Sequence, residues 1–354
     1  MSPAVRLAVP LNDRVDADRR PRHHRALVTT SGLHIVVAEP YDAQAVERLR
    51  GLGTVTTLSA CDAATLAQAI GDCDALLVRT GAQVSADLLA RAARLKVIGR
   101  AGVGLENIDV AAARARGIEV VYTPEAATDA VADLTVGLLL AVLRDIPRLD
   151  REVRAGRFAA ARAAAVSREL GGLTLGIVGL GRIGRAVARR CRHGFGTRIL
   201  YNDIVEPGFL DFVATGVTKE ELYAGSDVVS LHVPLTDLTR HLIEATALGQ
   251  FKPGAILINT ARGAVVDSLA LTEALTAGRL AGAGLDVVEP EPLPTGHPLL
   301  TAPGVVFTPH IGARTQAGLA RMHAVVEDVA AVLTGGRPKY PAPHSPLDSG
   351  RATT

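Results

Sequence analysis

Residues 175–184, LGIVGLGRIG, decide the fold of this 354-residue chain. The first four form the apolar run of a buried strand, and residues 185–191 have the pattern of a helix. Between them, Gly179 permits a tight turn, Gly181 lets the backbone approach a pyrophosphate, and Gly184 lets the helix pack closely on the strand. The N–H groups at the start of such a helix bind phosphates. The stretch therefore predicts a dinucleotide-binding unit of a parallel α/β sheet.

An acidic residue beyond this loop indicates which dinucleotide is bound. Asp203 follows the next predicted strand, residues 198–201, about 20 residues after Gly184. A carboxylate at this place accepts hydrogen bonds from the ribose hydroxyls and repels a 2′-phosphate. We therefore expect NAD as the cofactor, while Arg198 on the same strand keeps NADP open as the alternative.

Strand and helix patterns alternate on both sides of the Gly loop. A long apolar helix over residues 129–144 separates an earlier α/β unit from the unit that contains the loop, and a helix over residues 317–333 ends the ordered body. Such alternation predicts the α/β class, with two Rossmann-like doubly wound parallel-sheet domains. The expected strands are residues 34–37, 75–78, 96–98, 119–122, 173–178, 198–201, 227–231, 255–259, 282–286 and 305–307.

Composition excludes several other classes of protein. The apolar stretch over residues 134–143 is too short to span a bilayer, and three scattered cysteines without metal-ligand spacing are typical of a reducing cytoplasm. Residues 1–33 hold six Arg against three Asp, a net charge of +3 that leaves −1 on the rest of the chain. We interpret them as a disordered extension rather than a nucleic-acid arm, and residues 337–354 as a flexible tail. A cytoplasmic protein that binds neither metal, membrane nor nucleic acid is expected.

Chemistry-bearing side chains follow three predicted strands. Because the carboxyl ends of parallel strands line the ligand crevice, these side chains are expected to meet there. Hydride transfer to a 2-keto acid requires a cation for the substrate carboxylate and carbonyl, and a proton for the forming alkoxide. The guanidinium of Arg262 suits the first task and His310 the second, with Glu291 keeping the imidazole oriented and protonated. The three segments are 259–263 (NTARG), 286–292 (DVVEPEP) and 308–312 (TPHIG).

Four motifs together resemble the D-isomer-specific 2-hydroxyacid dehydrogenase family, and within it most closely the phosphoglycerate dehydrogenases. The resemblance extends from about residue 34 to about residue 333. It implies an NAD-dependent enzyme that interconverts a small anionic D-2-hydroxy acid and its 2-keto acid. Arg262, Glu291 and His310 are implied as the catalytic residues. The motifs are residues 176–185, 259–267, 283–292 and 308–312.

The resemblance also implies how the domains and subunits are arranged. The NAD domain, residues 131–311, would be inserted into a discontinuous substrate domain formed by residues 34–130 and 312–336. Relatives are usually homodimers, and residues 129–157 would contribute to the interface.

Further site residues are expected in two groups. Arg79 and Arg100 match arginines that bind the substrate phosphate in phosphoglycerate dehydrogenases, while the backbone of Val103 and Gly104 would hold the substrate carboxylate. Arg314, four residues after His310, is expected either to bind a second anionic group or to face solvent. The expected cofactor-binding residues are Gly179, Gly181, Arg182, Ile183, Gly184, Asp203, Val233, Thr260, Ala261, Asp286 and Gly312.

Departures from the phosphoglycerate dehydrogenase pattern keep the substrate open. Ala127 replaces an expected Asn, as in glyoxylate and hydroxypyruvate reductases, and Arg314 replaces a small hydroxyl residue. No regulatory domain is expected. Reduction of glyoxylate, hydroxypyruvate or a phosphonate analogue is therefore an alternative. An alternative of another class is an NAD(H)-sensing binding protein similar to transcriptional corepressors.

Overall fold

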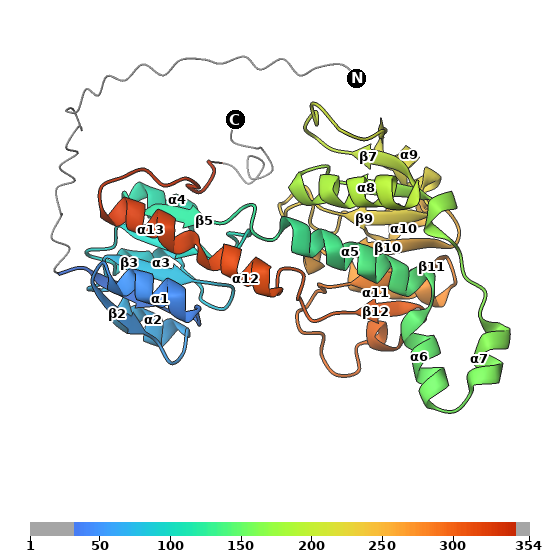
Figure 1. The fold of residues 1–354 in the computed structure, drawn as a ribbon, viewed down its shortest axis with the longest axis horizontal. Coiled ribbons are helices and arrows are strands. Elements are labelled where there is room, and N and C mark those ends of the chain that lie inside the picture. Colours follow the sequence, from blue (N-terminus) through green and yellow to red (C-terminus); the bar gives the residue numbers. More distant parts are fainter. Residues whose placement is uncertain (1–31, 345–354) are drawn as a thin grey trace, which may run out of the picture.

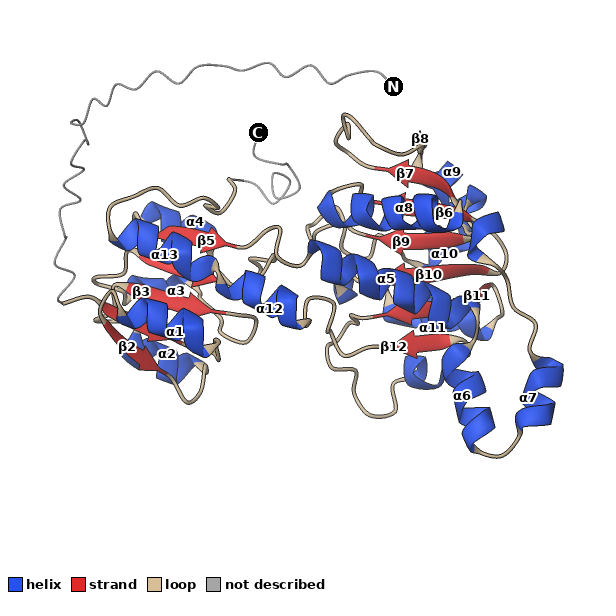
Figure 2. Ribbon diagram, viewed as in Figure 1, coloured by secondary structure: helices blue, strands red, loops and turns tan. Residues whose placement is uncertain are grey.

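The computed structural model describes residues 32–344, which form two lobes, each built on a parallel sheet with helices on both faces (Figures 1 and 2). The expected extension, residues 1–33, thus lies almost entirely outside the described residues, as do residues 345–354 of the expected tail. The chain passes from the first lobe to the second before α5 (Thr128–Leu143) and returns before α12 (Gln316–His323). This confirms the predicted α/β class and the insertion of one lobe into the other.

The first lobe contains a five-stranded parallel sheet covered by helices from both ends of the chain. Its elements are β1 (His34–Val37), α1 (Ala43–Arg50), β2 (Thr54–Thr57), α2 (Ala63–Ala69), β3 (Ala75–Val78), α3 (Ala86–Ala90), β4 (Val97–Arg100), α4 (Val110–Ala115), β5 (Glu119–Tyr122), α12 and α13 (Val325–Leu333). The strand order is β2-β1-β3-β4-β5. Ile35 and Val37 pack with α1 and the returning α13, while Val36 packs with α2, α3 and α4. A Cβ on Gly99 would clash with Val329 of α13, so the returning helix lies directly on the sheet.

The second lobe contains a seven-stranded parallel sheet. Besides α5, its regular elements are α6 (Ile146–Arg154), α7 (Phe158–Ala164), β6 (Thr174–Val178), α8 (Arg182–Phe195), β7 (Arg198–Asn202), β8 (Thr215–Gly216), α9 (Lys219–Gly225), β9 (Val228–Leu231), α10 (Ala245–Gln250), β10 (Ala255–Asn259), α11 (Ser268–Thr276), β11 (Leu280–Leu285) and β12 (Val305–Phe307). The strand order is β12-β11-β10-β9-β6-β7-β8. Helices α5 and α8 share one apolar cluster with the sheet, and α9, α10 and α11 share another.

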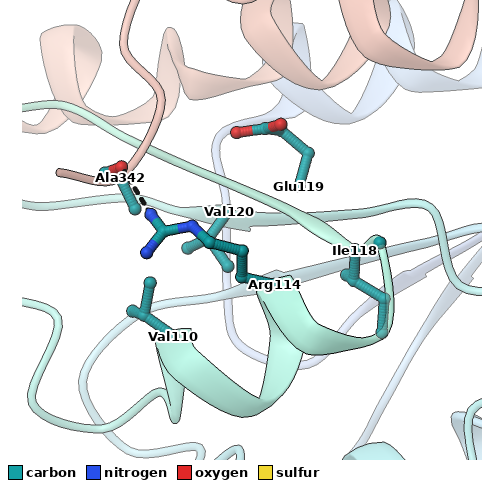
Figure 3. A pocket seen from close by; sticks show the side chains of 7 residues that line it. Val110, Arg114, Ile118, Glu119, Val120 and Ala342 are labelled. Carbon is teal, nitrogen blue, oxygen red and sulfur yellow. Dashed lines mark hydrogen bonds between the residues drawn. The ribbon is translucent and has the colours of Figure 1, made fainter. Parts of the chain in front are cut away.

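Two segments differ from expectation for identifiable reasons. The strand β2 was not predicted, because its Thr-rich sequence is mostly exposed at the edge of the sheet and lacks an apolar pattern. The expected flexible tail is wrong for part of its length: Val121 of β5 pairs with Pro341, and the Ala342 N–H donates to the Val120 carbonyl at 2.7 Å. Figure 3 shows Arg114 reaching the Ala342 carbonyl on this side of the lobe. The open edge of β5 offers backbone partners that tail composition does not reveal.

Each sheet carries one buried aspartate immediately before a central strand. Asp74 precedes β3 and accepts a hydrogen bond from the His34 N–H of β1 at 3.0 Å. Asp227 precedes β9 and accepts one from the Thr174 N–H of β6 at 2.9 Å. Each also binds two cations, and for Asp227 these are Arg168 and Lys252 at 2.7 and 2.6 Å. The two carboxylates stabilise equivalent strand starts in the two sheets.

Replacing Asp227 with Asn is expected to lower the free energy of unfolding at pH 7 by about 2 kcal/mol. Burial opposes ionisation of Asp227, but Lys252, the Thr174 N–H and Arg168 outweigh it, and its pKa lies below the usual value. A group whose pKa is lower in the folded state stabilises above the unfolded pKa and loses this effect as the pH falls through the folded one. Urea denaturation should therefore show a difference between variant and wild type that shrinks below about pH 4. Asp237→Asn, on an exposed side chain, is the matched control; equal losses in both variants would contradict the role of Asp227.

Among residues 32–344, none of the helices has the length and apolarity needed to cross a membrane. The same residues contain no group of three or more His, Cys, Asp or Glu side chains arranged to hold a metal ion.

Candidate active site

The Gly loop joins β6 to α8 as the sequence predicts. Gly179 has φ of 90°, and a Cβ there would lie 2.7 Å from the His232 carbonyl oxygen, so only glycine fits. Gly181 is the N-cap of α8; no side chain caps the helix, and the space beside its Cα is open. The N–H groups of the first turn can therefore receive a pyrophosphate, and the donor set fits a dinucleotide.

Asp203 lies beside this loop at the end of β7. Its Oδ2 accepts from the Leu180 N–H at 2.6 Å and its Oδ1 from the Val205 N–H at 2.9 Å, and each oxygen keeps a further lone pair for a ribose hydroxyl. Arg198 is at the opposite end of the same strand, where it pairs in register with Thr174 at the start of β6. The cation that kept NADP open therefore lies away from the ribose site.

Arg185, a residue to which the sequence analysis assigned no role, links the Gly loop to the segment that follows Asp203. Its Nε donates to the Leu180 carbonyl at 3.0 Å, and Nη1 donates to the Phe209 carbonyl at 3.2 Å. Nη2 contacts the Pro207 carbonyl. One guanidinium thus ties the segment after Asp203 to the Gly loop.

A tight turn after β10 presents Arg262. The fully buried Asn259 shapes it, because its Oδ1 accepts from the Ala261 N–H at 3.0 Å and its Nδ2 donates to the Arg262 carbonyl at 2.9 Å. Thr260 is buried, with its hydroxyl 2.9 Å from that of Thr135 on α5. The side chain of Arg262 then points away from its own lobe.

Arg262 meets the first lobe at the loop after β4. Its Nε donates to Glu106 Oε1 at 2.9 Å, and a Cβ on Gly104 would clash with its Nη2. Gly104, one of the two residues expected to hold the substrate carboxylate through their backbone, therefore lies beside the guanidinium. Glu106 was missed by the sequence analysis, since no motif marks it.

Two further arginines of the first lobe lie at neighbouring strand ends, Arg100 at the end of β4 and Arg79 directly after β3. Arg100 is 6% exposed; its Nη1 donates to the Ala101 carbonyl at 2.7 Å, and its buried Nε has no hydrogen-bond partner among the described residues. Burial lowers the pKa of Arg100; the charge of Glu106 opposes this and that of Arg262 adds to it. The backbone of Arg79 is fixed by Glu39, whose Oε2 accepts a hydrogen bond from the Arg79 N–H at 2.6 Å. Arg100 and Arg262 are therefore close enough for their charges to interact, whereas the Arg79 guanidinium donates to the Pro40 carbonyl at 3.3 Å.

His310 and Glu291 form a close pair in the second lobe. The imidazole Nδ1 lies 2.6 Å from Glu291 Oε1, and both side chains are partly exposed. This contact engages Nδ1 with the carboxylate and leaves Nε2 for a ligand. The backbone of His310 is left-handed, with φ of 51°, and its N–H donates to the Asp286 carbonyl at 2.8 Å.

Asp286 has a task that the sequence did not predict. Its buried carboxylate accepts hydrogen bonds from the Thr308 hydroxyl at 2.6 Å and from the N–H groups of Ile311 and Gly312 at 2.9 and 2.8 Å. It therefore anchors the segment that carries His310. Its expected contact with the cofactor stays a prediction.

The remaining expected residues are placed with fewer contacts. Val233 lies against Gly179, and Gly312 packs on Asp286 and α5. Arg314 is exposed, and its side chain makes no hydrogen bond or ion pair with another described residue. His232, which the sequence analysis did not name, has Nε2 at 2.9 Å from the Ser230 hydroxyl, and burial lowers its pKa well below the usual value.

The structure thus combines a Gly loop, an acidic residue after the next strand and a His–Glu pair in one lobe. An Arg of that lobe contacts the other lobe. These features define an α/β protein of the dinucleotide-binding class. Residues 136–312 match the NAD binding domain of the D-isomer specific 2-hydroxyacid dehydrogenases, and this range contains the Gly loop, Arg262, Glu291 and His310. The chain belongs to the D-isomer specific 2-hydroxyacid dehydrogenase family.

Relatives and solved structures agree with this assignment. The chain is 41% identical over 305 residues to D-3-phosphoglycerate dehydrogenase of Methanocaldococcus jannaschii, which covers 85% of this chain and 57% of that protein. It is 40% identical over 283 residues to hydroxypyruvate reductase of Thermotoga maritima, covering 79% and 91%. The TT0316 protein of Thermus thermophilus superposes with a TM-score of 0.82 at 40% identity, covering 88% and 100%. The chain thus spans little more than half of that phosphoglycerate dehydrogenase but nearly all of the hydroxypyruvate reductase.

Proposed function

We propose that the protein interconverts a small anionic D-2-hydroxy acid and its 2-keto acid with NAD. The observation that carries the proposal is the His310–Glu291 pair, 2.6 Å apart, in the matched domain that also presents Arg262 and the Gly loop. When bound, the cofactor supplies or accepts the hydride. The protein's own groups must then bind the substrate anion, polarise its carbonyl and move one proton.

Each of these tasks has a candidate side chain. The guanidinium of Arg262, beside Gly104, would bind the substrate carboxylate and polarise the carbonyl oxygen. His310 would give its Nε2 proton to the forming alkoxide and take it back in the oxidation direction. Glu291, at Nδ1, would hold the ring and stabilise the imidazolium. These catalytic roles are part of the proposal.

A phosphorylated substrate is the first choice within this class. Arg100 is buried with an unpartnered Nε, and Arg79 lies on the neighbouring strand end, so the first lobe offers two cations besides Arg262. Glyoxylate or hydroxypyruvate is the alternative, favoured by Ala127 and by the 40% identity with a hydroxypyruvate reductase. The exposed Arg314 would extend the positive charge toward a second anionic group.

A substrate panel tests the function directly. NADH oxidation would be followed by the loss of NADH absorbance with 3-phosphohydroxypyruvate, hydroxypyruvate, glyoxylate and phosphonopyruvate, and repeated with NADPH. We expect NADH to be preferred and the phosphorylated keto acid to be reduced fastest. Tight NADH binding without turnover of any keto acid would overturn the enzyme proposal and favour an NAD(H)-sensing protein. An Arg314→Ser variant with an unchanged preference among the four acids would remove Arg314 from the substrate site.

We also propose that two copies of the chain form a homodimer through the arm of α6 and α7. The arm projects from the second lobe (Figure 1) and exposes large apolar side chains, with Phe158 58% and Ile146 52% exposed. Exposed apolar surface of this kind marks an interaction site. A molar mass of a single chain in solution at micromolar concentration would contradict the dimer.

A further inference from the structure

We propose that Glu106 is a positioning residue that aligns Arg262 across the two lobes and tunes the affinity of the site for anionic substrates. The inference rests on the proposed function, because it assigns Glu106 a task in the reaction that Arg262 would serve. Glu106 follows β4 in the first lobe, whereas Arg262 follows β10 in the second, 156 positions away in the chain.

The contacts define how the guanidinium is oriented. Nε donates to Glu106 Oε1 at 2.9 Å and Nη1 donates to the Ala261 carbonyl at 2.7 Å, while Nη2 faces Gly104. A Cβ on Gly104 would clash with both Arg262 Nη2 and Glu106 Oε2, so the pair lies directly over this loop. Two contacts thus hold the planar group, and its Nη2 side is left toward the loop expected to receive the carboxylate. Without Glu106 the long side chain would regain rotamer freedom, and substrate binding would have to remove it.

The charges give Glu106 a second effect. Two guanidiniums, Arg100 and Arg262, are close enough to influence each other, and Glu106 is a carboxylate near both. The Glu106 side chain is 42% exposed. Its partial burial acts to raise its pKa, but the charge of Arg262 and its hydrogen bond outweigh this, so the pKa lies below its usual value and the group is ionised at neutral pH. It therefore offsets one positive charge that would otherwise attract the substrate anion. Glu106 should improve the alignment of Arg262 while weakening anion affinity.

Two variants of Glu106 distinguish its effect on the alignment of Arg262 from its effect on anion affinity. Glu106→Gln keeps an acceptor for Arg262 Nε but removes the charge, so we expect kcat within about threefold of wild type and KM for the best keto acid of the panel lower by about threefold. Glu106→Ala removes both, and kcat should fall by about tenfold to a hundredfold because the guanidinium is no longer aligned. Titration with oxalate in the presence of NADH should show a lower Kd for the Gln variant.

Two controls distinguish positioning from a structural effect. Glu47→Ala breaks an exposed ion pair with Arg50 in the same lobe and should leave kcat and KM unchanged. The Kd of NADH, measured by fluorescence, should be the same in all variants. In an Arg262→Lys background, Glu106→Ala should change kcat by less than twofold, since the alignment by Glu106 acts through the guanidinium, while KM should still fall because the negative charge is removed.

The outcomes are separable. Wild-type turnover together with Glu106→Ala kinetics equal to those of Glu47→Ala would overturn the role of Glu106 alone. An undiminished effect of Glu106→Ala on kcat in the Arg262→Lys background would also overturn it. Wild-type protein that reduces none of the four keto acids would overturn both this inference and the proposed function.

Discussion

Replacing His310 with Asn is expected to lower kcat for 2-keto acid reduction by about a thousandfold, with the Kd of NADH within about twofold of wild type. In the proposed function the imidazole carries the proton: its Nδ1 is engaged by Glu291 at 2.6 Å, and Nε2 would face the substrate. An Asn side chain can still donate a hydrogen bond but cannot supply a proton near neutral pH. The loss should therefore appear in kcat and leave cofactor binding intact.

The companion variants make this test specific. Glu291→Gln keeps a polar contact to Nδ1 but removes the charge that stabilises the imidazolium, so a smaller loss, about tenfold to a hundredfold, is expected. His193→Asn, on an exposed histidine of α8, is the matched control and should have wild-type kinetics. A His310→Asn variant that retains more than a tenth of the wild-type kcat would exclude His310 as the proton donor.

Replacing Arg262 with Gln is expected to lower kcat/KM by about a thousandfold or more. A charge-assisted hydrogen bond contributes about 1.5–3 kcal/mol, and the fork would make two such bonds to a substrate carboxylate. Since about 1.4 kcal/mol corresponds to a factor of ten, loss of both bonds accounts for this effect. The variant also leaves Glu106 without its partner at 2.9 Å.

Arg262→Lys separates charge from geometry. Lysine keeps the positive charge but lacks the planar fork, so about a hundredfold loss in kcat/KM is expected. Arg189→Gln is the control. Arg189 lies on α8, its exposed side chain pairs with Asp211, and its replacement should leave the kinetics unchanged. Equal kinetics of Arg262→Gln and wild type across the keto-acid panel would show that another cation binds the carboxylate.

The folding pattern could be predicted where the information is local. The Gly-x-Gly-x-x-Gly turn, the apolar runs and the acidic residue after β7 each depend on neighbouring residues, and the structure confirms the α/β class with two parallel sheets. The strand β2 was missed because its exposed Thr-rich residues bury little and so leave no apolar signal. Residues 339–342 were assigned to a tail because their composition says nothing about the free edge of β5.

For the candidate site, too, some features could be predicted from the sequence and others depend on tertiary structure. His310, Glu291 and Arg262 follow predicted strands, so the sequence by itself indicated that these side chains lie at the carboxyl edge of the sheet. It also favoured a Gly loop that binds NAD. Tertiary structure alone decided what these side chains contact: Glu106 reaches Arg262 from the other lobe, and Asp286 anchors the His310 segment through three hydrogen bonds. Periodicity and motifs specify local backbone geometry, whereas such contacts depend on how the folded lobes meet. The sequence therefore predicted which side chains could carry the chemistry of the site, and the fold determined how their charges are paired.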